Sequence, residues 1–392
     1  MSGPLPVQQK ERVTIVDVVR GFALIGVIIA NFTSYVDQNL PSKIYDSTSL
    51  PLDRALSYVN IIFFEWKFMT IFSVLFGYGF GLILISLGKK DIHPDAFFMR
   101  RMFWLFVIGL MHTLFWWGDV LHFYAICGLL LLAFRHLSVK VLLVYSILCM
   151  FIIPPLLSFL FQHQPNYFTD KNIQHLYEQY RYGHVIDVFT SNINLYYQAF
   201  ILTGTDLHDI CETLGRFLFG YVLLRVGLFE LIKTKAHIFK NILLVTTPIT
   251  TTYLIVRWLS LQETISTENF YLEPLIKLGI ISTSSFYVSI LVLFFIKYEH
   301  NIFFKMLQTL GKMTLTNYLS ISVFCITVLY GIGFGKLGIF PIRIMWLCAL
   351  GLLIFEIAFS AYWLNKFRYG PVEWIWRELT YRKRIPLRKG MK

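Results

Sequence analysis

Long apolar runs alternate with short polar stretches along the whole chain. Runs of about 20 apolar residues are long enough to cross the hydrocarbon core of a bilayer as helices. The pattern predicts about ten such spans, with a tight WWGDV turn between the third and the fourth. Their expected ranges are 15–35, 68–87, 102–117, 120–134, a fifth run ending near 161, 208–228, 239–259, 273–296, 312–330 and 343–365. The predicted fold is therefore an all-α polytopic membrane helix bundle.

The longest polar interval, residues 163–207, divides the chain into two membrane halves. Aromatic side chains are interspersed through it, which favours helices at the membrane interface over an open loop. A shorter amphipathic helix is expected over 55–67. The predicted organisation is an N-terminal half over 1–162 with about five spans, the external interfacial segment, a C-terminal half over 208–381 with about five spans, and a basic tail over 382–392.

Composition and charge agree with a membrane protein. Of the 392 residues, 56% are hydrophobic and only 15% are charged, which excludes an ordinary soluble domain. The net charge of +12 would suggest nucleic-acid binding in a soluble protein, but here the basic residues lie between the apolar runs. Lysine and arginine accumulate in cytosolic loops. We therefore expect no nucleic-acid partner.

The distribution of charge predicts the orientation of the bundle. The basic excess lies in the arm 1–12, in the loops at 89–101, 135–140, 233–240 and 297–312, and in the tail. Acidic residues such as Asp46, Glu263 and Glu268 lie in the opposite loops. Both termini are therefore expected to be cytosolic, and the WWGDV turn external.

The first predicted span carries polar groups that a membrane helix does not need. Asp17 and Arg20 lie at one end of its apolar core, and Asn31 lies at the other. Arg20 and Asn31 are eleven residues apart, so on a helix they share one face roughly 16 Å apart along the axis. Two interpretations of Arg20 stay open: an ion pair with Asp17 that anchors the helix, or a site for a phosphate or carboxylate from the cytosol.

His112, Asp119 and His122 are the densest group of polar residues near predicted spans. Asp119 and His122 have the i, i+3 spacing of one helix face, and the tight hairpin brings His112 towards the same carboxylate. A histidine oriented by an aspartate can act as a general base near neutral pH. The alternative is structural: each imidazole hydrogen-bonds a neighbouring helix, and Asp119 caps the fourth span. No HExxH motif or third ligand indicates a metal.

Three further polar side chains lie inside predicted spans, where they are costly unless they are paired. Arg216 in the sixth span admits the same two interpretations as Arg20. Asn317 in the ninth span and Glu356 in the tenth are expected, with Asp17, to give buried polar support. Glu356 needs a partner, for which Arg216 or a histidine of the bundle is the expected candidate.

Four ordered segments carry a family resemblance. They are RGFALIGVIIAN (20–31), WGDVLHFYAICG (117–128), GKMTLTNYL (311–319) and RYGPVEWIWRELTY (368–381). Together they resemble the YeiB-like family of bacterial inner-membrane proteins, also called domain of unknown function 418. The resemblance extends from the first span to the tail. It implies a multi-pass protein of the bacterial cytoplasmic membrane and no particular activity, because that family is functionally uncharacterised.

The first span is also similar, more distantly, to that of integral-membrane acyltransferases, namely the heparan-glucosaminide acetyltransferase type and the sugar O-acyltransferases. In the O-acyltransferases an arginine is followed eleven positions later by a catalytic histidine, and Asn31 stands at that position here. The glucosaminide type is similar in having asparagine there, with its histidine in the loop beyond. No histidine lies between Asn31 and His93 in this chain, so His112 or His122 would have to supply the base.

The leading hypothesis is a membrane-embedded acyltransferase that moves an acyl group from a cytosolic thioester donor, such as acyl-CoA, to an envelope glycan, lipid or small molecule. Arg20 would bind donor phosphate, Asn31 would hydrogen-bond the reacting carbonyl, and His112 with Asp119 would be the base and its orienting group. The alternatives are a transporter or flippase for an anionic solute or lipid, and a non-catalytic membrane scaffold. Membrane lipids are the expected partners, no tightly bound cofactor is expected, and the sequence gives no oligomeric state.

Overall fold

The computed structural model of the chain describes residues 14–37, 50–88, 93–164, 167–230, 232–262 and 271–390. Several residues used in the charge pattern lie outside these ranges: the arm 1–12, Asp46, Lys89, Lys90, Glu263, Glu268 and Lys392. The described residues form helices and turns, with one isolated bridge between Phe367 and Arg388. The predicted all-α fold is confirmed.

The N-terminal half contains most of the helices that surround the first span. They are α1 (Thr14–Asp37), α3 (Pro51–Val59), the π-helical turn η2 (Asn60–Phe64), α4 (Lys67–Gly88), α5 (Pro94–Phe115), α6 (Leu121–Phe134), α7 (Val139–Ile147), the π-helical turn η3 (Leu148–Ile152) and α8 (Ile153–Phe161). The polar interval that follows is helical too, as α9 (Asp170–Tyr182), α10 (Val185–Tyr196) and the π-helical turn η4 (Tyr197–Ile201). Its position at the membrane interface stays a prediction.

The C-terminal half ends in a short helix after the last predicted span. Its helices are α11 (Thr205–Arg225), α12 (Ala236–Leu261), α13 (Glu273–Tyr298), α14 (Ile302–Lys312), α15 (Thr314–Leu329), α16 (Ile342–Lys366) and α17 (Pro371–Tyr381). The predicted span 312–330 was expected to be continuous. The structure instead bends the chain by 79° between α14 and α15, so Lys312 ends one helix and Thr314 begins the next.

A helix lies at each of the ten predicted spans. Within the described ranges, seven helical segments are long and apolar enough to cross a bilayer, and the bent pair α14 and α15 adds an eighth. Two expected spans do not pass that test, because α6 has only 14 residues and α11 carries Asp206, Asp209, Glu212, Arg216 and Arg225. The protein is a multi-pass membrane bundle, and ten crossings remain a prediction.

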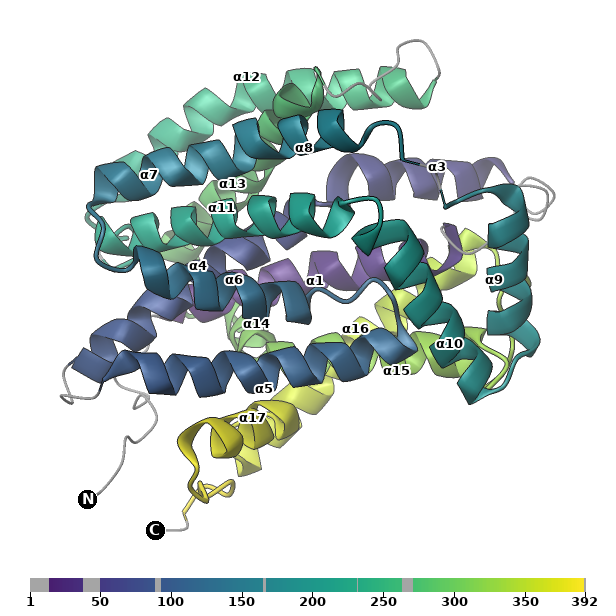
Figure 1. Cartoon of the computed structure of the whole chain (residues 1–392). Helices are drawn as coiled ribbons and strands as arrows, with labels where there is room; N and C mark the ends of the chain where they lie inside the picture. The colour runs from purple at the N-terminus through teal and green to yellow at the C-terminus, as the bar shows by residue number, and fades with distance from the viewer. Residues whose placement is uncertain are drawn as a thin grey trace.

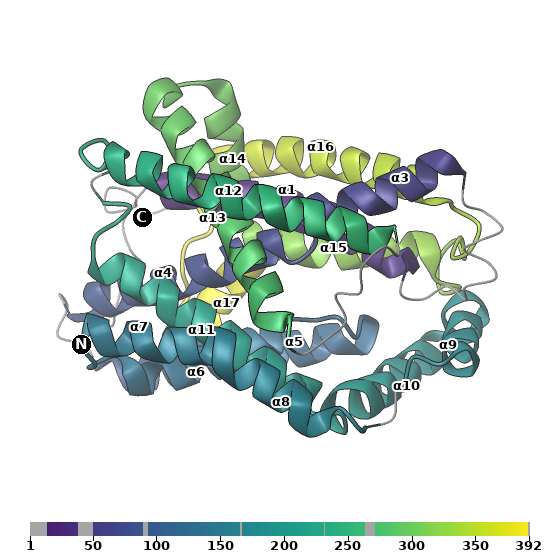
Figure 2. The same cartoon turned by 90° about the horizontal axis from the view of Figure 1, so that it is seen from above.

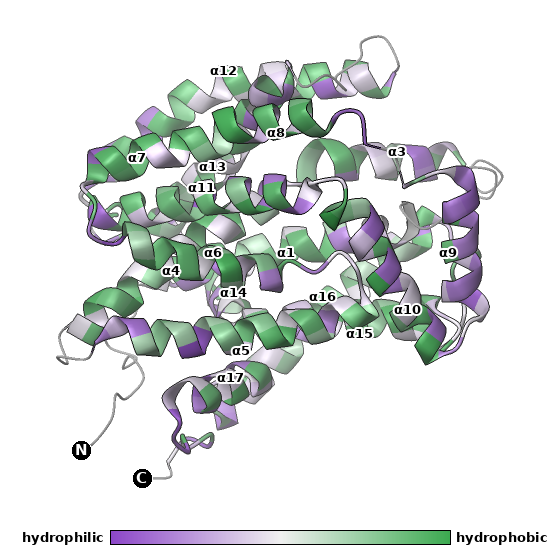
Figure 3. Ribbon diagram, viewed as in Figure 1, coloured by the Kyte–Doolittle hydropathy of each residue, from purple (hydrophilic) through white to green (hydrophobic). Residues whose placement is uncertain are grey.

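Helix α1 lies inside the bundle, where helices from both halves of the chain surround it (Figure 1). It packs against α4, α13, α14, α15 and α16, and the view from above shows it between these layers (Figure 2). Its apolar residues Val18, Ala23, Leu24 and Ile28 are fully buried. Apolar residues predominate on the outer helices α7, α8 and α12, whereas α9 is mostly polar (Figure 3). The apolar outer faces suit contact with lipid.

Close helix contacts depend on glycine at several crossings. A methyl group at Gly77 of α4 would overlap the carbonyl oxygen of Phe217 on α11, and one at Gly220 of α11 would overlap the carbonyl oxygen of Val74. Small residues let membrane helices approach in this way. The pair Gly77 and Gly220 therefore sets the distance between α4 and α11.

We expect Gly77→Ala to destabilise the protein by about 1–3 kcal/mol, because the added methyl group forces two backbones apart. Gly351→Ala is the matched control, since nothing lies within 4 Å of a methyl group added at Gly351 in α16. That control should leave stability unchanged or raise it. Thermal unfolding of the purified variants in detergent compares them, and equal melting temperatures for both would contradict the close crossing.

Candidate functional site

A cavity of about 450 Å³ lies along one face of α1, enclosed by α4, α5, α6, α15 and α17. All four segments that carry the family resemblance contribute to its wall, although Arg20 and Arg377 lie at opposite ends of the chain. The lining residues from these segments are Arg20, Leu24, Val27, Asn31, Gly118, Val120, Leu121, Tyr124, Gly311, Lys312, Thr314, Leu315, Tyr318, Glu373, Trp376 and Arg377. The cavity is the candidate site.

One end of the cavity is charged and contains Arg20. The Arg20 guanidinium lies 3.5 Å from the carboxylate of Asp17, which is buried, and its own side chain remains 25% exposed. Gly79 of α4 makes room for it, because a Cβ there would lie 2.6 Å from Nη2 of Arg20. Arg20 thus forms the ion pair with Asp17, and because it also lines the cavity the interpretation as an anion site stays a prediction.

Further charged groups from other elements surround this end. Arg101 of α5 stacks on Trp376 of α17, with its guanidinium carbon 3.7 Å from the ring centroid. Lys312, Arg377 and Glu230 also line the wall. Several cations from separate helices therefore meet here, which suits an anionic group such as a phosphate.

Glu373 joins two of the family segments. Its carboxylate accepts hydrogen bonds from the backbone N–H groups of Leu315 (2.7 Å) and Thr316 (3.1 Å), and from the Thr316 hydroxyl (2.5 Å). It therefore caps the N-terminus of α15, where unpaired N–H groups favour a negative charge. Burial raises the pKa of Glu373, and the hydrogen bonds from Thr316 and Leu315 oppose that rise. This carboxylate holds the α14–α15 bend against α17.

The middle of the cavity is apolar. Leu24 and Val27 of α1 face Phe72, Phe76 and Phe80 of α4 across it. No charged side chain interrupts this stretch among the described lining residues. The space suits a hydrocarbon chain more than a polar solute.

Asn31 lies at the opposite end, beside Trp116, Gly118 and Tyr318. Its side-chain nitrogen Nδ2 is buried and finds no acceptor among the described residues. A buried donor without an acceptor is unfavourable by about 1–3 kcal/mol. A carbonyl or hydroxyl oxygen of a bound molecule would supply the missing acceptor.

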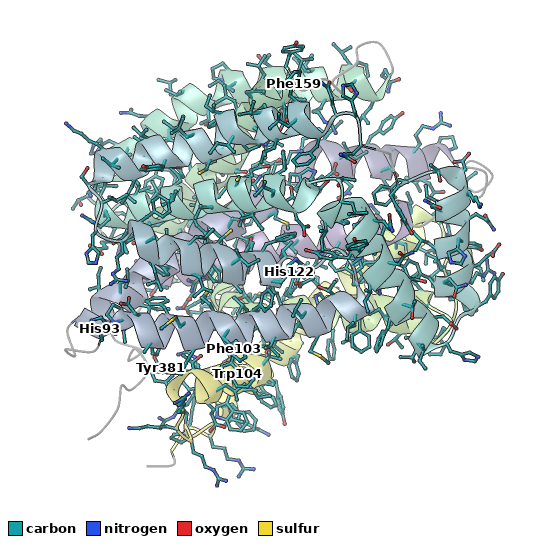
Figure 4. All side chains as sticks on the ribbon, in the orientation of Figure 1. His93, Phe103, Trp104, His122, Phe159 and Tyr381 are labelled. Carbon is teal, nitrogen blue, oxygen red and sulfur yellow. The ribbon has the colours of Figure 1, made fainter. Side chains whose placement is uncertain are left out.

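The two histidines share one carboxylate, as the sequence spacing predicts. Nδ1 of His112 lies 2.7 Å from Oδ1 of Asp119, and Nδ1 of His122 lies 2.8 Å from Oδ2. The backbone N–H of His122 also donates to Oδ2 at 3.2 Å, so Asp119 caps α6 as well. All three residues are buried, and His122 lies in the interior of the bundle (Figure 4).

The carboxyl group of Asp119 is held ionised by its partners. Burial in the turn between α5 and α6 acts to raise its pKa, but the hydrogen bonds from His112 and His122 outweigh burial and lower it. Because an ionised carboxylate only accepts hydrogen bonds, both Nδ1 atoms must carry protons. The arrangement fixes the tautomer of both rings.

The His112 imidazole stands one aromatic layer away from the cavity. The His112 ring lies 5.5 Å from that of Tyr318 and 6.0 Å from that of Trp116, centroid to centroid, and both aromatic residues line the cavity. The structure therefore brings Arg20 and Asn31 together in one cavity and places His112, Asp119 and His122 directly behind its wall.

The sequence did not reveal the outer partners of the histidines. Nε2 of His112 lies 2.6 Å from Oγ of Ser322 on α15, and Nε2 of His122 lies 2.9 Å from the hydroxyl of Tyr196 on α10. That hydroxyl donates to Oδ2 of Asp206 at 2.6 Å. These partners are 74 to 210 residues from the histidines in the chain, and no spacing rule links them.

The sequence offered one signal for the role of Glu373, which lies in the family segment 368–381. Glu373 follows directly after Gly370–Pro371 and Val372, a position that indicates a carboxylate at the start of a helix.

Arg216 follows the ion-pair interpretation, whereas Glu356 has a different partner from the one expected. Arg216 pairs with Glu212 on its own helix and lines a second, smaller cavity of about 110 Å³, so it does not join Arg20. Glu356 accepts from the Ser320 hydroxyl at 2.6 Å and pairs with neither Arg216 nor a histidine among the described residues. Helix α15, which the sequence could not place beside α16, supplies its partner. Asn317 donates to Ser360 at 3.1 Å across the same interface.

A further cluster at the start of α11 resembles a metal site. His208, Asp209 and Glu212 each offer a ligand atom within 4.8 Å of the others. However, Nζ of Lys277 lies 3.1 Å from Glu212 and 2.6 Å from Glu273. An ammonium group at that position repels a metal ion. The cluster is better described as an ion-pair network between α11 and α13.

Fold and cavity together define an all-α, multi-pass membrane protein with an amphipathic site along its first helix. Residues 223–383 match the family described as "Protein of unknown function (DUF418)". The chain is 27% identical to the uncharacterized protein YxaH of Bacillus subtilis over the full length of both, and 26% identical to the uncharacterized protein YeiB of Escherichia coli over 96% of this chain and 98% of YeiB. It is also 27% identical to an uncharacterized protein from the amylase 3' region of Bacillus acidopullulyticus, over 97% of each chain.

These matches confirm the resemblance drawn from the four segments: the chain is similar to YeiB and YxaH along its length and to the DUF418 family over residues 223–383. No solved structure matches it at a significant level. The names of the relatives state no activity, so an account of function has to start from the cavity.

Proposed function

We propose that this protein is a membrane-embedded acyltransferase that binds an acyl thioester in the cavity along α1. The observation that carries the proposal is the polarity of that cavity, with Arg20 at one end, an apolar middle, and the unpaired Asn31 amide at the other. A thioester donor such as acyl-CoA has matching parts, namely phosphates, a hydrocarbon chain and a carbonyl oxygen.

The lining residues suggest a role for each part of the donor. Arg20, with Arg101 and Arg377 nearby, would bind phosphate. The phenylalanines of α4 would contact the hydrocarbon portion, and Nδ2 of Asn31 would donate to the thioester oxygen, where negative charge develops during attack. Arg216 has no part in this proposal, because it lies in the other cavity.

The acceptor hydroxyl or amine would enter beside Trp116 and Tyr318. His112, already oriented by Asp119, would take its proton once one of these aromatic side chains moves aside. The acceptor oxygen or nitrogen then bonds to the acyl carbon, the carbon–sulfur bond breaks, and the proton passes to the leaving thiolate. The acceptor and the thioester are consumed, the ester or amide and the free thiol are formed, and no further reactant is needed.

The proposed orientation follows from the positive-inside pattern. The Arg20 end would face the cytosol and its thioester pool, and the Asn31 end would face the exterior of a bacterial cytoplasmic membrane. An envelope glycan, lipid or small molecule would then be the acceptor. Bacterial relatives support this location.

Asn31→Ala tests the proposal in purified protein reconstituted in lipid nanodiscs with acyl-CoA. Removing one hydrogen-bond donor to the reacting oxygen is expected to lower kcat for transfer or thioester hydrolysis roughly 100- to 1000-fold. Binding of the donor should change much less. Asn317→Ala is the control, because it removes a buried asparagine that does not line the cavity. Thioester turnover that is absent in the wild type would count against acyl transfer and favour a scaffold.

One observation favours a transporter as the second candidate. Helices α14 and α15 form a span bent by 79°, with the N-terminus of α15 at the cavity, and interrupted helices surround substrate sites in many transporters. Uptake of an intact anionic solute into proteoliposomes, lost in Arg20→Ala and accompanied by no thioester cleavage, would favour this candidate over acyl transfer.

A further inference from the structure

His112, Asp119 and His122 form a histidine cluster. Its hydrogen bonds continue in both directions and form one unbroken hydrogen-bond chain. It connects α15 through the cluster to α10 and the first turn of α11. Its members are Ser322, His112, Asp119, His122, Tyr196 and Asp206. Heavy-atom distances along it run from 2.6 to 2.9 Å, so every link is short enough for proton transfer.

The inner end of this hydrogen-bond chain is buried, and its outer end is partly buried: Oδ1 of Asp206 is enclosed and has no partner among the described residues. Ser322, His112, Asp119 and His122 are each at most 7% exposed. Tyr196, the last residue of α10, and Asp206, in the first turn of α11, are partly exposed, and α10 lies beside α9 at one end of the bundle (Figure 1). The chain therefore runs from behind the cavity wall to the end that the charge pattern predicts to be external.

Tyr196 has one hydroxyl proton but two neighbours that compete for it. If Tyr196 donates to an ionised Asp206, its oxygen must accept from Nε2 of His122, and that ring carries both protons as an imidazolium. If Asp206 is protonated and donates to Tyr196, the hydroxyl donates to Nε2 of a neutral His122 instead. The two arrangements differ only in the position of one proton.

Both arrangements have the same net charge. In the first, His122 is positive while Asp119 and Asp206 are negative; in the second, only Asp119 is charged. A proton can therefore pass between His122 and Asp206 through Tyr196 without adding a charge to the buried cluster. An added buried charge would be unfavourable.

The surroundings of Tyr196, the group between His122 and Asp206, keep its hydroxyl neutral. Burial, together with the neighbouring Asp206, raises the pKa of Tyr196, so it stays a phenol that passes protons on and does not itself ionise. Further titratable groups that face the hydrogen-bond chain are Asp209 beside Asp206, Tyr318 beside Asp119 and Tyr35 beside Ser322. Trp116, which stacks on Tyr35, completes the inner wall.

We propose that this chain is a proton relay that exchanges protons between the histidine cluster behind the cavity and the end of the bundle at Asp206. The relay does not depend on the identity of the substrate. If the proposed acyl transfer is correct, the relay also gives His122, which shares the Asp119 carboxylate with His112, a route for passing a proton to and from Asp206.

Nitrogen NMR of ¹⁵N-histidine-labelled protein in lipid nanodiscs tests the relay, with the His122 signals assigned by His122→Gln. The chemical shift of an imidazole nitrogen distinguishes a protonated atom from a bare one. In the wild type, Nε2 of His122 should have a shift between these two values, because its proton is shared with Asp206. The measurement reads proton positions directly, so it remains valid if acyl transfer fails.

Two variants and one control decide the result. Tyr196→Phe keeps the ring and removes the link, so the His122 shift should move to a single protonation state. Asp206→Asn, whose amide can donate to Tyr196 but cannot take up a proton, should move His122 to the neutral state. Tyr197→Phe, at the adjacent exposed tyrosine, should match the wild type. A His122 shift that is the same in the wild type, Tyr196→Phe and Asp206→Asn would overturn the relay. If Tyr196→Phe does not fold, the comparison of Asp206→Asn with the wild type decides the result.

Discussion

Replacing Arg20 by alanine is expected to weaken binding of an acyl thioester by roughly ten- to a hundredfold. The guanidinium faces the cavity at its charged end, and a hydrogen bond to a charged group contributes about 1.5–3 kcal/mol. Arg20→Lys should recover only part of the affinity, because an ammonium group cannot make the bidentate contact of a guanidinium. Isothermal titration of nanodisc-embedded protein with acyl-CoA measures the effect.

Arg225→Ala is the matched control for Arg20→Ala. Arg225 is exposed at the C-terminal end of α11 and does not line the cavity, so its replacement removes the same charge from the same end of the bundle. Equal loss of affinity in both variants would show that Arg20 acts through its charge alone and does not contact the donor. An unchanged affinity in Arg20→Ala would remove the basis for a donor phosphate site at Arg20.

The second large effect is expected for Asp119→Asn, which should lower the stability of the folded protein. Its carboxylate accepts from two imidazoles and from the backbone N–H of His122. Asparagine offers one acceptor oxygen, and its amide protons would meet the remaining Nδ1–H, so one imidazole must lose its partner or change tautomer. Disrupting a buried hydrogen-bonded charge network typically costs about 3–5 kcal/mol. Asp119→Asn should therefore melt well below the wild type.

The pH dependence of this difference has a defined sign. Because the hydrogen bonds from the imidazoles lower the pKa of Asp119 in the folded protein, its stabilisation is fully present above the ordinary aspartate pKa of about 3.9. It is lost as pH falls below that value through the lowered pKa. The gap in melting temperature between wild type and Asp119→Asn should therefore close as pH falls below about 4. A gap that widens at low pH would contradict the assigned charge of Asp119.

Much of the fold was predictable because lipid imposes a simple rule. Backbone polar groups in a bilayer must be satisfied within a helix, so long apolar runs led directly to helices at the ten predicted ranges. The same rule made Asp17, Arg20 and Asn31 conspicuous, and all three line the cavity. The i, i+3 spacing of Asp119 and His122, with a tight turn beside it, was enough to predict their contact with His112.

The remaining features depend on how helices that are distant in sequence are arranged. Nothing local shows that α15 packs against α16, so the partner of Glu356 was expected to be a charged residue and is Ser320. Ser322, Tyr196 and Asp206 reach the histidines from three separate helices. The helix that begins after the bend at Lys312 is capped by Glu373, a carboxylate more than 50 residues further along the chain. Tertiary contacts of this kind leave no periodic pattern.

The central claim is that the cavity along α1 holds a molecule with an anionic head and an apolar chain, and photo-crosslinking tests it most directly. Nanodisc-embedded protein would be irradiated with an acyl-CoA analogue that carries a diazirine in its chain, and labelled peptides would be identified by mass spectrometry. The account predicts labels on cavity residues such as Leu24, Val27 and Phe76, with loss of these labels in Arg20→Ala and retention in Arg225→Ala. Labels spread over outward-facing positions such as Leu244 and Ile354, with none in the cavity and no effect of Arg20→Ala, would contradict it.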